Sequence, residues 1–214
     1  MSLFVFPRWA NKTRALAGAA IGFTPLYLTG LVWYGASPKT TDVGYAPEQP
    51  VPYSHALHAG ELGLDCRYCH TTVERAGHAA IPETMTCMNC HSRVRTESKA
   101  LAPVRDGAKT DQPVEWLKVH DLPDYVYFNH SAHVSRGVGC VSCHGRVDQM
   151  EVVYQKEPLS MSWCLTCHRN PEPNLRPPAE ATNMNWTQPD PEFGKRFREE
   201  NHINPPTDCS TCHR

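Results

Sequence analysis

The stretch Cys66-Arg67-Tyr68-Cys69-His70 contains a C-x-x-C-H motif, and this pattern occurs five times in the 214 residues of the chain. All ten cysteines belong to these motifs, which are Cys66, Cys69 and His70; Cys87, Cys90 and His91; Cys140, Cys143 and His144; Cys164, Cys167 and His168; and Cys209, Cys212 and His213. C-x-x-C-H is the attachment signature of haem c. Two thiols at this spacing reach the two vinyl groups on one porphyrin edge, and the adjacent histidine lies under the iron as proximal ligand. The sequence therefore predicts five covalent haem c groups.

Other uses of C-x-x-C pairs fit the sequence less well. Such pairs also build zinc ribbons, thioredoxin-like sites and disulfides, but none of these needs a histidine after the second cysteine. With 12 histidines in 214 residues, five such matches by chance are on the order of one in a million. No cysteine remains for a disulfide framework or a thiolate nucleophile.

Seven further histidines are candidate distal ligands for the five irons, and four of them form a repeated pattern. Tyr53-Ser54-His55-Ala56-Leu57-His58 precedes Cys66, and Phe128-Asn129-His130-Ser131-Ala132-His133 precedes Cys140. A second attachment motif follows in each case, at Cys87 and at Cys164, so the chain contains an internal duplication. Two histidines three residues apart on a helical turn project from one face, and they can therefore serve two haems.

This pattern resembles the small class III cytochromes, the c3/c7 family. In that family the first histidine of the pair ligates the haem of its own module, and the second reaches a neighbouring haem. The resemblance implies that His55 serves the Cys66 haem and that His130 serves the Cys140 haem. By the same resemblance, His58 and His133 ligate the Cys87 and Cys164 haems.

The fifth distal ligand has several candidates. His120 lies just before the second module, Met161 lies three residues before Cys164, and His202 lies seven before Cys209. We rank His120 first, followed by Met161 and His202, with His78 last. A methionine ligand would raise the potential of its haem over that of its bis-histidine neighbours.

Composition predicts a domain of short helices and irregular loops with little sheet. Charged residues make up 20% of the chain, aromatic residues 9%, and there are 19 prolines. Proline and glycine interrupt every stretch, so long helices and a conventional core are not expected. Covalent haems would supply the missing apolar bulk. The net charge of −1 gives no indication of nucleic-acid binding.

The N-terminal region is predicted to cross a membrane once. Residues 15–35 contain no charged side chain, and about 20 such residues span a bilayer as a helix. Arg8, Lys12 and Arg14 precede this stretch, which predicts a cytoplasmic N-terminus and a haem domain on the periplasmic side of a bacterial cytoplasmic membrane. A cleaved signal peptide is the alternative, but the apolar stretch is longer than a usual signal core.

These features divide the chain into six segments. We expect a cytoplasmic stub over 1–14, the membrane helix over 15–35, a tether over 36–52, a first dihaem module with a linker over 53–119, a second dihaem module over 120–170, and a proline-rich segment with the fifth haem over 171–214.

One membrane helix followed by five attachment motifs resembles the pentahaem cytochrome subunits of bacterial alternative complex III. Three segments carry this resemblance most closely, namely 64–70, 127–133 and 160–164. It implies an electron-transfer subunit, without a catalytic centre of its own, that relays electrons from a quinol-oxidising complex to a periplasmic carrier or terminal oxidase. It also implies an iron–sulfur subunit of molybdopterin-oxidoreductase type, polytopic quinol-binding subunits and a monohaem cytochrome as partners.

Two other functions compete with this interpretation. A membrane-anchored multihaem quinol dehydrogenase would oxidise quinol directly, but the tetrahaem members of that class have one haem fewer. A multihaem enzyme such as a nitrite reductase needs an open iron position, often with a C-x-x-C-K motif, and the chain has none. An iron with two protein ligands cannot bind substrate, which argues against catalysis at haem.

Overall fold

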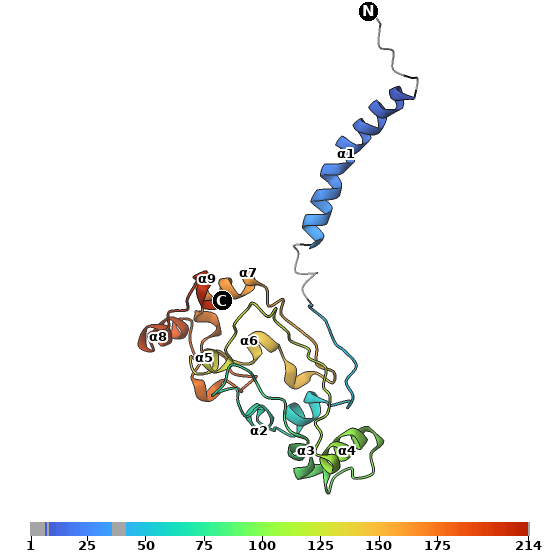
Figure 1. Ribbon diagram of the computed structural model, residues 1–214. Helices are drawn as coiled ribbons and strands as arrows, with labels where there is room; N and C mark the ends of the chain where they lie inside the picture. Colours follow the sequence, from blue (N-terminus) through green and yellow to red (C-terminus); the bar gives the residue numbers. More distant parts are fainter. Residues whose placement is uncertain (1–6, 8, 36–41, 214) are drawn as a thin grey trace, which may run out of the picture. The chain divides into compact units, whose positions relative to one another are not determined.

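The computed structural model describes residue 7, residues 9–35 and residues 42–213, and the chain divides into two compact units between Asp42 and Val43 (Figure 1). The first unit contains helix α1 (Ala10–Gly35), which has 26 residues. At 1.5 Å per residue it is about 39 Å long, more than the roughly 30 Å hydrocarbon thickness of a bilayer. From Lys12 to Gly35 it is apolar enough to cross a membrane, by length and composition. The helix is therefore compatible with a membrane anchor.

The second unit is built from short helical elements joined by irregular loops. None of its described helices exceeds nine residues. Two isolated antiparallel bridges, Val126 with His213 and Val138 with Leu175, are the β-structure in the described residues. The elements are η2 (Ala56–Glu61, a π-helical turn), α2 (Cys66–Cys69), α3 (Thr84–His91), η3 (Lys99–Leu101), α4 (Ala102–Thr110), α5 (His130–Val134), α6 (Val141–His144), η4 (Val147–Gln149), α7 (Met161–Arg169), η5 (Glu172–Asn174), η6 (Pro178–Glu180), α8 (Phe193–Glu200) and α9 (Cys209–Cys212).

The protein core of this unit is small. Among the described residues the buried apolar side chains are Val51, Val104, Val134, Met150, Leu175, Ala181 and Ile203. A domain of this length normally buries far more apolar surface, because folding must offset the conformational entropy of the chain. The expected fold class is confirmed, with short helices, loops and one apolar N-terminal helix. The interior needs apolar material that the side chains do not supply.

Part of the expected tether packs on the haem domain. The amide of Gly44 donates to the Gln155 carbonyl at 2.8 Å, and the Gln155 amide donates to the Tyr45 carbonyl at 3.1 Å. Val51 is 4% exposed. Residues 43–52 therefore belong to the second unit, whereas residues 36–41 lie outside the described residues.

The segment expected as a linker contains a packed helix. Helix α4 has Pro103 in its first turn and is capped at its C-terminus by Asp111, whose φ of 55° is left-handed. It lies against α3, with Val104 1% exposed. Gly107 is required there, because a Cβ would come 2.6 Å from the Gln112 carbonyl oxygen and 2.9 Å from Cγ2 of Thr84. A proline near the start and a left-handed residue at the end are ordinary helix boundary signals.

Candidate haem sites

Each attachment motif includes a helical turn, and a side chain caps three of these turns. Asp65 accepts from the Arg67 amide at 2.8 Å, Ser160 from the Trp163 amide at 3.4 Å, and Asp208 from the Thr211 amide at 3.0 Å. Capping fixes where the turn begins, and residues three apart in a helix share a face. The local sequence thus directs both thiols of a motif to the same side.

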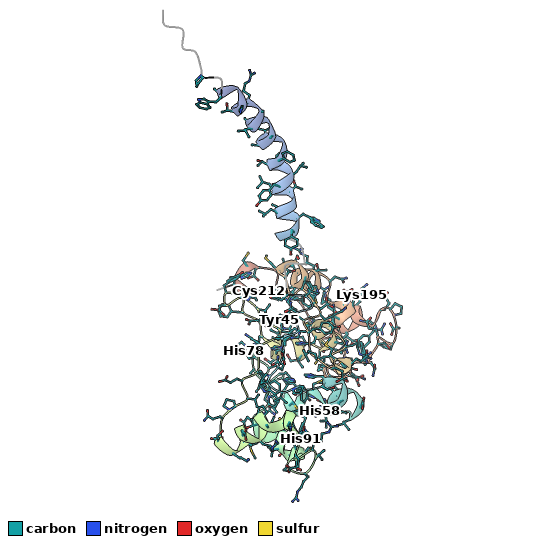
Figure 2. All side chains as sticks on the ribbon, turned by 90° about the vertical axis from the view of Figure 1, so that its right-hand side faces the viewer. Tyr45, His58, His78, His91, Lys195 and Cys212 are labelled. Carbon is teal, nitrogen blue, oxygen red and sulfur yellow. The ribbon has the colours of Figure 1, made fainter. Side chains whose placement is uncertain are left out.

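Three histidine pairs have the spacing that an iron between two imidazoles requires. A metal–imidazole bond of about 2 Å on each side separates the ring centroids by about 6 Å. The centroids of His58 and His91 are 6.2 Å apart, and Figure 2 shows these two residues close together. The centroids of His130 and His144 are 6.5 Å apart, with ring planes at 13°. Those of His133 and His168 are 6.0 Å apart. Each pair joins a motif histidine to the distal candidate that the resemblance assigns to it.

The duplicated pattern has the same geometry in both copies. The Tyr53 ring is edge-on to His55 at 4.8 Å and stacked on His58 at 4.4 Å. The Phe128 ring is edge-on to His130 at 4.8 Å and stacked on His133 at 4.5 Å. One aromatic ring therefore orients both histidines of each pair.

Backbone carbonyls accept from Nδ1 of most of the histidines expected at iron. The distances lie between 2.6 and 3.2 Å, and the rings are His58, His70, His91, His130, His133, His168 and His213. A proton held on Nδ1 leaves the Nε2 lone pair free, which is the usual way that proteins orient a metal-binding imidazole. The same Nδ1-to-carbonyl hydrogen bond is present in the proximal and in the distal histidines of this set.

Burial also favours the neutral form, which a metal ligand needs, in two of the rings expected at iron, His144 and His55. Burial lowers the pKa of His144 to about 3, with His120 and His130 adding to the effect. Burial lowers the pKa of His55 to about 4, followed by the charge of the nearby His70. His55 and His70 are the two residues expected at the Cys66 haem, so the structure also places this pair in one neighbourhood.

The remaining candidates lie in different surroundings. The His120 ring centroid is 4.4 Å from that of His144, too close for an iron between them, and its Nε2 is buried without a hydrogen-bond partner. Met161 begins α7 and is 61% exposed. His202 is exposed after α8 with a φ of 50°. His78 follows Gly77, whose carbonyl accepts from His130 at 2.9 Å.

The five motifs follow one another in space in an order that differs from their order in sequence. Beyond the effect of burial, the charge of Cys87 raises the pKa of Cys69. The Cys66 and Cys140 thiols share a hydrogen bond, which lowers the pKa of Cys66 to about 7. Burial and then Cys167 and Cys164 raise the pKa of Cys143 to about 12, and burial and then Cys212 raise that of Cys164. The spatial order is therefore that of the motifs at Cys87, Cys66, Cys140, Cys164 and Cys209.

The figures agree with this order. Helix α3 and helix α9 lie at opposite ends of the second unit, with α2 and α6 between them and α7 beside α9 (Figure 1). Figure 2, turned by 90°, also places His91 and Cys212 at opposite ends. This order has no local signal in the sequence, because the contact between Cys66 and Cys140 joins distant parts of the chain.

These residues fit covalent haem. Three pairs of imidazole rings are spaced as two ligands of one iron would be. The ten thiols are not in disulfides. The Nε2 atom of His120 is buried and has no hydrogen-bond partner in the protein. Haem iron supplies a one-electron ferric/ferrous couple when it is bound. The fold and these sites define a multihaem c-type cytochrome, a class of protein whose function is electron transfer.

Comparison with known proteins agrees with this class. Residues 126–214 match the family described as cytochrome c7 and related cytochrome c. The chain is also 29% identical over 177 residues to the "Menaquinone reductase, multiheme cytochrome c subunit" of Nitratidesulfovibrio vulgaris strain Hildenborough, and the match covers 73% of this chain and 83% of the relative. The family match includes three of the five attachment motifs, and the relative extends the similarity over most of the chain.

Proposed function

We propose that the chain binds five haem c groups through its ten cysteines, with the five motif histidines as proximal ligands. In this proposal the distal ligands are His55, His58, His130 and His133, each on the haem that the resemblance to the class III cytochromes assigns to it, and His120 on the fifth. The three ring pairs at 6.0 to 6.5 Å support the assignment most directly.

We propose further that the chain relays electrons along the spatial order of its motifs, between the Cys87 end and the Cys209 end. The succession of neighbouring thiols from α3 to α9 is the observation that carries this proposal. The protein's part is to hold each iron between two imidazoles. Substrate is thereby excluded from the iron, and little rearrangement is needed when an electron arrives.

We propose that this relay serves a quinol-oxidising complex of alternative complex III type. The relative's name supports a menaquinone pool as the redox partner, and the apolar helix α1 supports attachment to the bacterial cytoplasmic membrane. The basic residues Arg8, Lys12 and Arg14 before the apolar stretch support an N-terminus in the cytoplasm and a haem domain outside. The proposed partners are the bilayer, an iron–sulfur subunit of molybdopterin-oxidoreductase type, polytopic quinol-binding subunits and a monohaem cytochrome. Electrons would leave for a periplasmic carrier or a terminal oxidase.

The quinol reaction separates this proposal from direct quinol oxidation by the chain. Stopped-flow absorbance would follow haem reduction by a short-chain menaquinol in native membranes and in the purified full-length chain. We expect reduction in membranes to be roughly a hundredfold faster, because only the complex would hold quinol in a dedicated site. Equal rates would favour a quinol dehydrogenase. Haems that menaquinone oxidises but menaquinol does not reduce would reverse the proposed direction, in keeping with the relative's name.

The fifth distal ligand can be tested with three variants. The segment after His120 leads to Tyr125, whose carbonyl accepts from His213 at 3.2 Å, so this segment connects the His144 neighbourhood with the Cys209 motif. We expect His120→Ala to make one haem high-spin and able to bind carbon monoxide, whereas Met161→Leu and His202→Ala, at the other two leading candidates, leave the spectrum unchanged.

Met161 is the alternative because it lies one turn before Cys164, whose thiol is close enough to Cys212 for the charge of Cys212 to act on it. A methionine-ligated ferric haem has a weak far-red absorption band. If Met161→Leu abolishes such a band while His120→Ala has no effect, the fifth ligand is Met161 and the assignment to His120 is wrong.

A further inference from the structure

An arginine is buried in the haem domain without a carboxylate partner. Arg176 is 5% exposed. Its Nη1 donates to the Asn183 carbonyl at 3.0 Å, and its guanidinium carbon lies 5.1 Å from the centroid of the Trp186 ring. Its Nε is buried and has no hydrogen-bond partner. The side chain is therefore fixed in one place, with a donor still available.

This guanidinium packs against the peptide that carries Cys140. The Arg176 amide donates to the Gly137 carbonyl at 2.8 Å, and the Cys140 amide donates to the Ala181 carbonyl at 3.0 Å. A Cβ at Gly139 would overlap the guanidinium, so glycine before Cys140 leaves the space that Arg176 occupies. The attachment peptide and the segment 176–181 thus enclose the charge between them.

Four other arginines form ion pairs and thereby differ from Arg176. Arg67, Arg146, Arg196 and Arg198 each pair with a carboxylate at 2.6 to 3.2 Å. Among the described residues Arg176 has no such pair, although Glu180 lies close enough for its charge to act on the guanidinium. Burying a cation without a bonded anion costs free energy of folding. A structural role alone would be met at lower cost by an apolar side chain that stacks on Trp186.

We propose that Arg176 is a fixed positive charge that raises the reduction potential of the haem attached at Cys140. An arriving electron reduces the positive charge of that haem by one unit, so a nearby cation in a low-dielectric site stabilises the ferrous form. Arg176 thus favours the presence of an electron on the Cys140 haem, which is the third of the five haems in the spatial order. This inference rests on the proposed haem at Cys140.

Spectroelectrochemical titration of the full-length protein tests the role of the charge. In Arg176→Gln we expect the ferric/ferrous equilibrium of one haem to shift about tenfold toward ferric, a lowering of about 59 mV for one electron. Arg176→Lys keeps the charge and should retain most of the native potential. Arg196→Gln makes the same chemical change at an exposed position and should leave all potentials unchanged.

Haem content, measured separately, distinguishes failure of this inference from failure of the proposed haem sites. A fully loaded Arg176→Gln protein with native potentials would overturn the inference, and so would equal shifts in the Gln and Lys variants. If Arg176→Gln does not load haem, Glu180→Gln replaces it. Removing that carboxylate should raise the same potential, and an unchanged value would contradict the role of Arg176. A native protein without haem at Cys140 would instead contradict the proposed function.

Discussion

Replacement of Cys140 and Cys143 together by alanine is expected to remove one haem and to destabilise the whole haem domain. This motif lies in the middle of the spatial order, beside the Cys66 thiol and the Cys164 motif. The domain has few buried apolar side chains of its own. Loss of a group larger than a tryptophan should cost at least the roughly 3–5 kcal/mol of a buried Trp→Ala change, a large part of a typical total of about 5–15 kcal/mol. Haem content by pyridine haemochrome and the urea midpoint of the purified chain measure both effects.

The matched control is the same double replacement at Cys209 and Cys212. This motif lies at one end of the order, and Cys209 is exposed. We expect it to lose one haem as well, but to leave the urea midpoint close to that of the native protein. If both double variants lowered the urea midpoint equally, the Cys140 haem would stabilise the domain no more than the Cys209 haem does, despite its central position.

The haem-binding residues could be predicted from the sequence wherever haem attachment requires a fixed spacing between residues. A C-x-x-C-H motif must bring two thiols and an imidazole to one porphyrin edge, so Cys66, Cys69 and His70 can be recognised without a structure. The paired histidines His130 and His133 were recognisable for a related reason, since one helical turn must serve two irons. The multihaem class and the short-helix fold could therefore be predicted.

Long-range packing was not predictable in the same way. No local pattern indicates that Cys66 meets Cys140, or that Arg176 fills the space that Gly139 leaves empty. Helix α4 also escaped prediction within the expected linker, because its apolar side has few residues and its stability depends on α3. Its local signals, Pro103 and the left-handed Asp111, carry little weight until that packing is known.

Replacement of His133 by alanine is expected to open one iron position per chain. His133 faces His168 with ring centroids 6.0 Å apart, and its Nδ1 donates to the Asn129 carbonyl at 2.7 Å. An iron that loses this ligand becomes five-coordinate and high-spin, and it then binds carbon monoxide. We expect the reduced native protein to show no carbon monoxide shift and the variant to show one at about a fifth of its haem. Added imidazole should restore the low-spin spectrum, because it refills the vacated position.

His58→Ala provides the matched variant in the other copy of the duplication. His58 faces His91 at 6.2 Å, stacks on Tyr53 as His133 stacks on Phe128, and donates from Nδ1 to the Ser54 carbonyl at 2.8 Å. Because the two copies share this geometry, the two variants should bind carbon monoxide to the same extent, and the double variant should bind about twice as much. If either single variant kept a fully low-spin spectrum, another side chain would hold that iron. The spacing of the two rings would then not identify the iron ligands in that copy of the duplication.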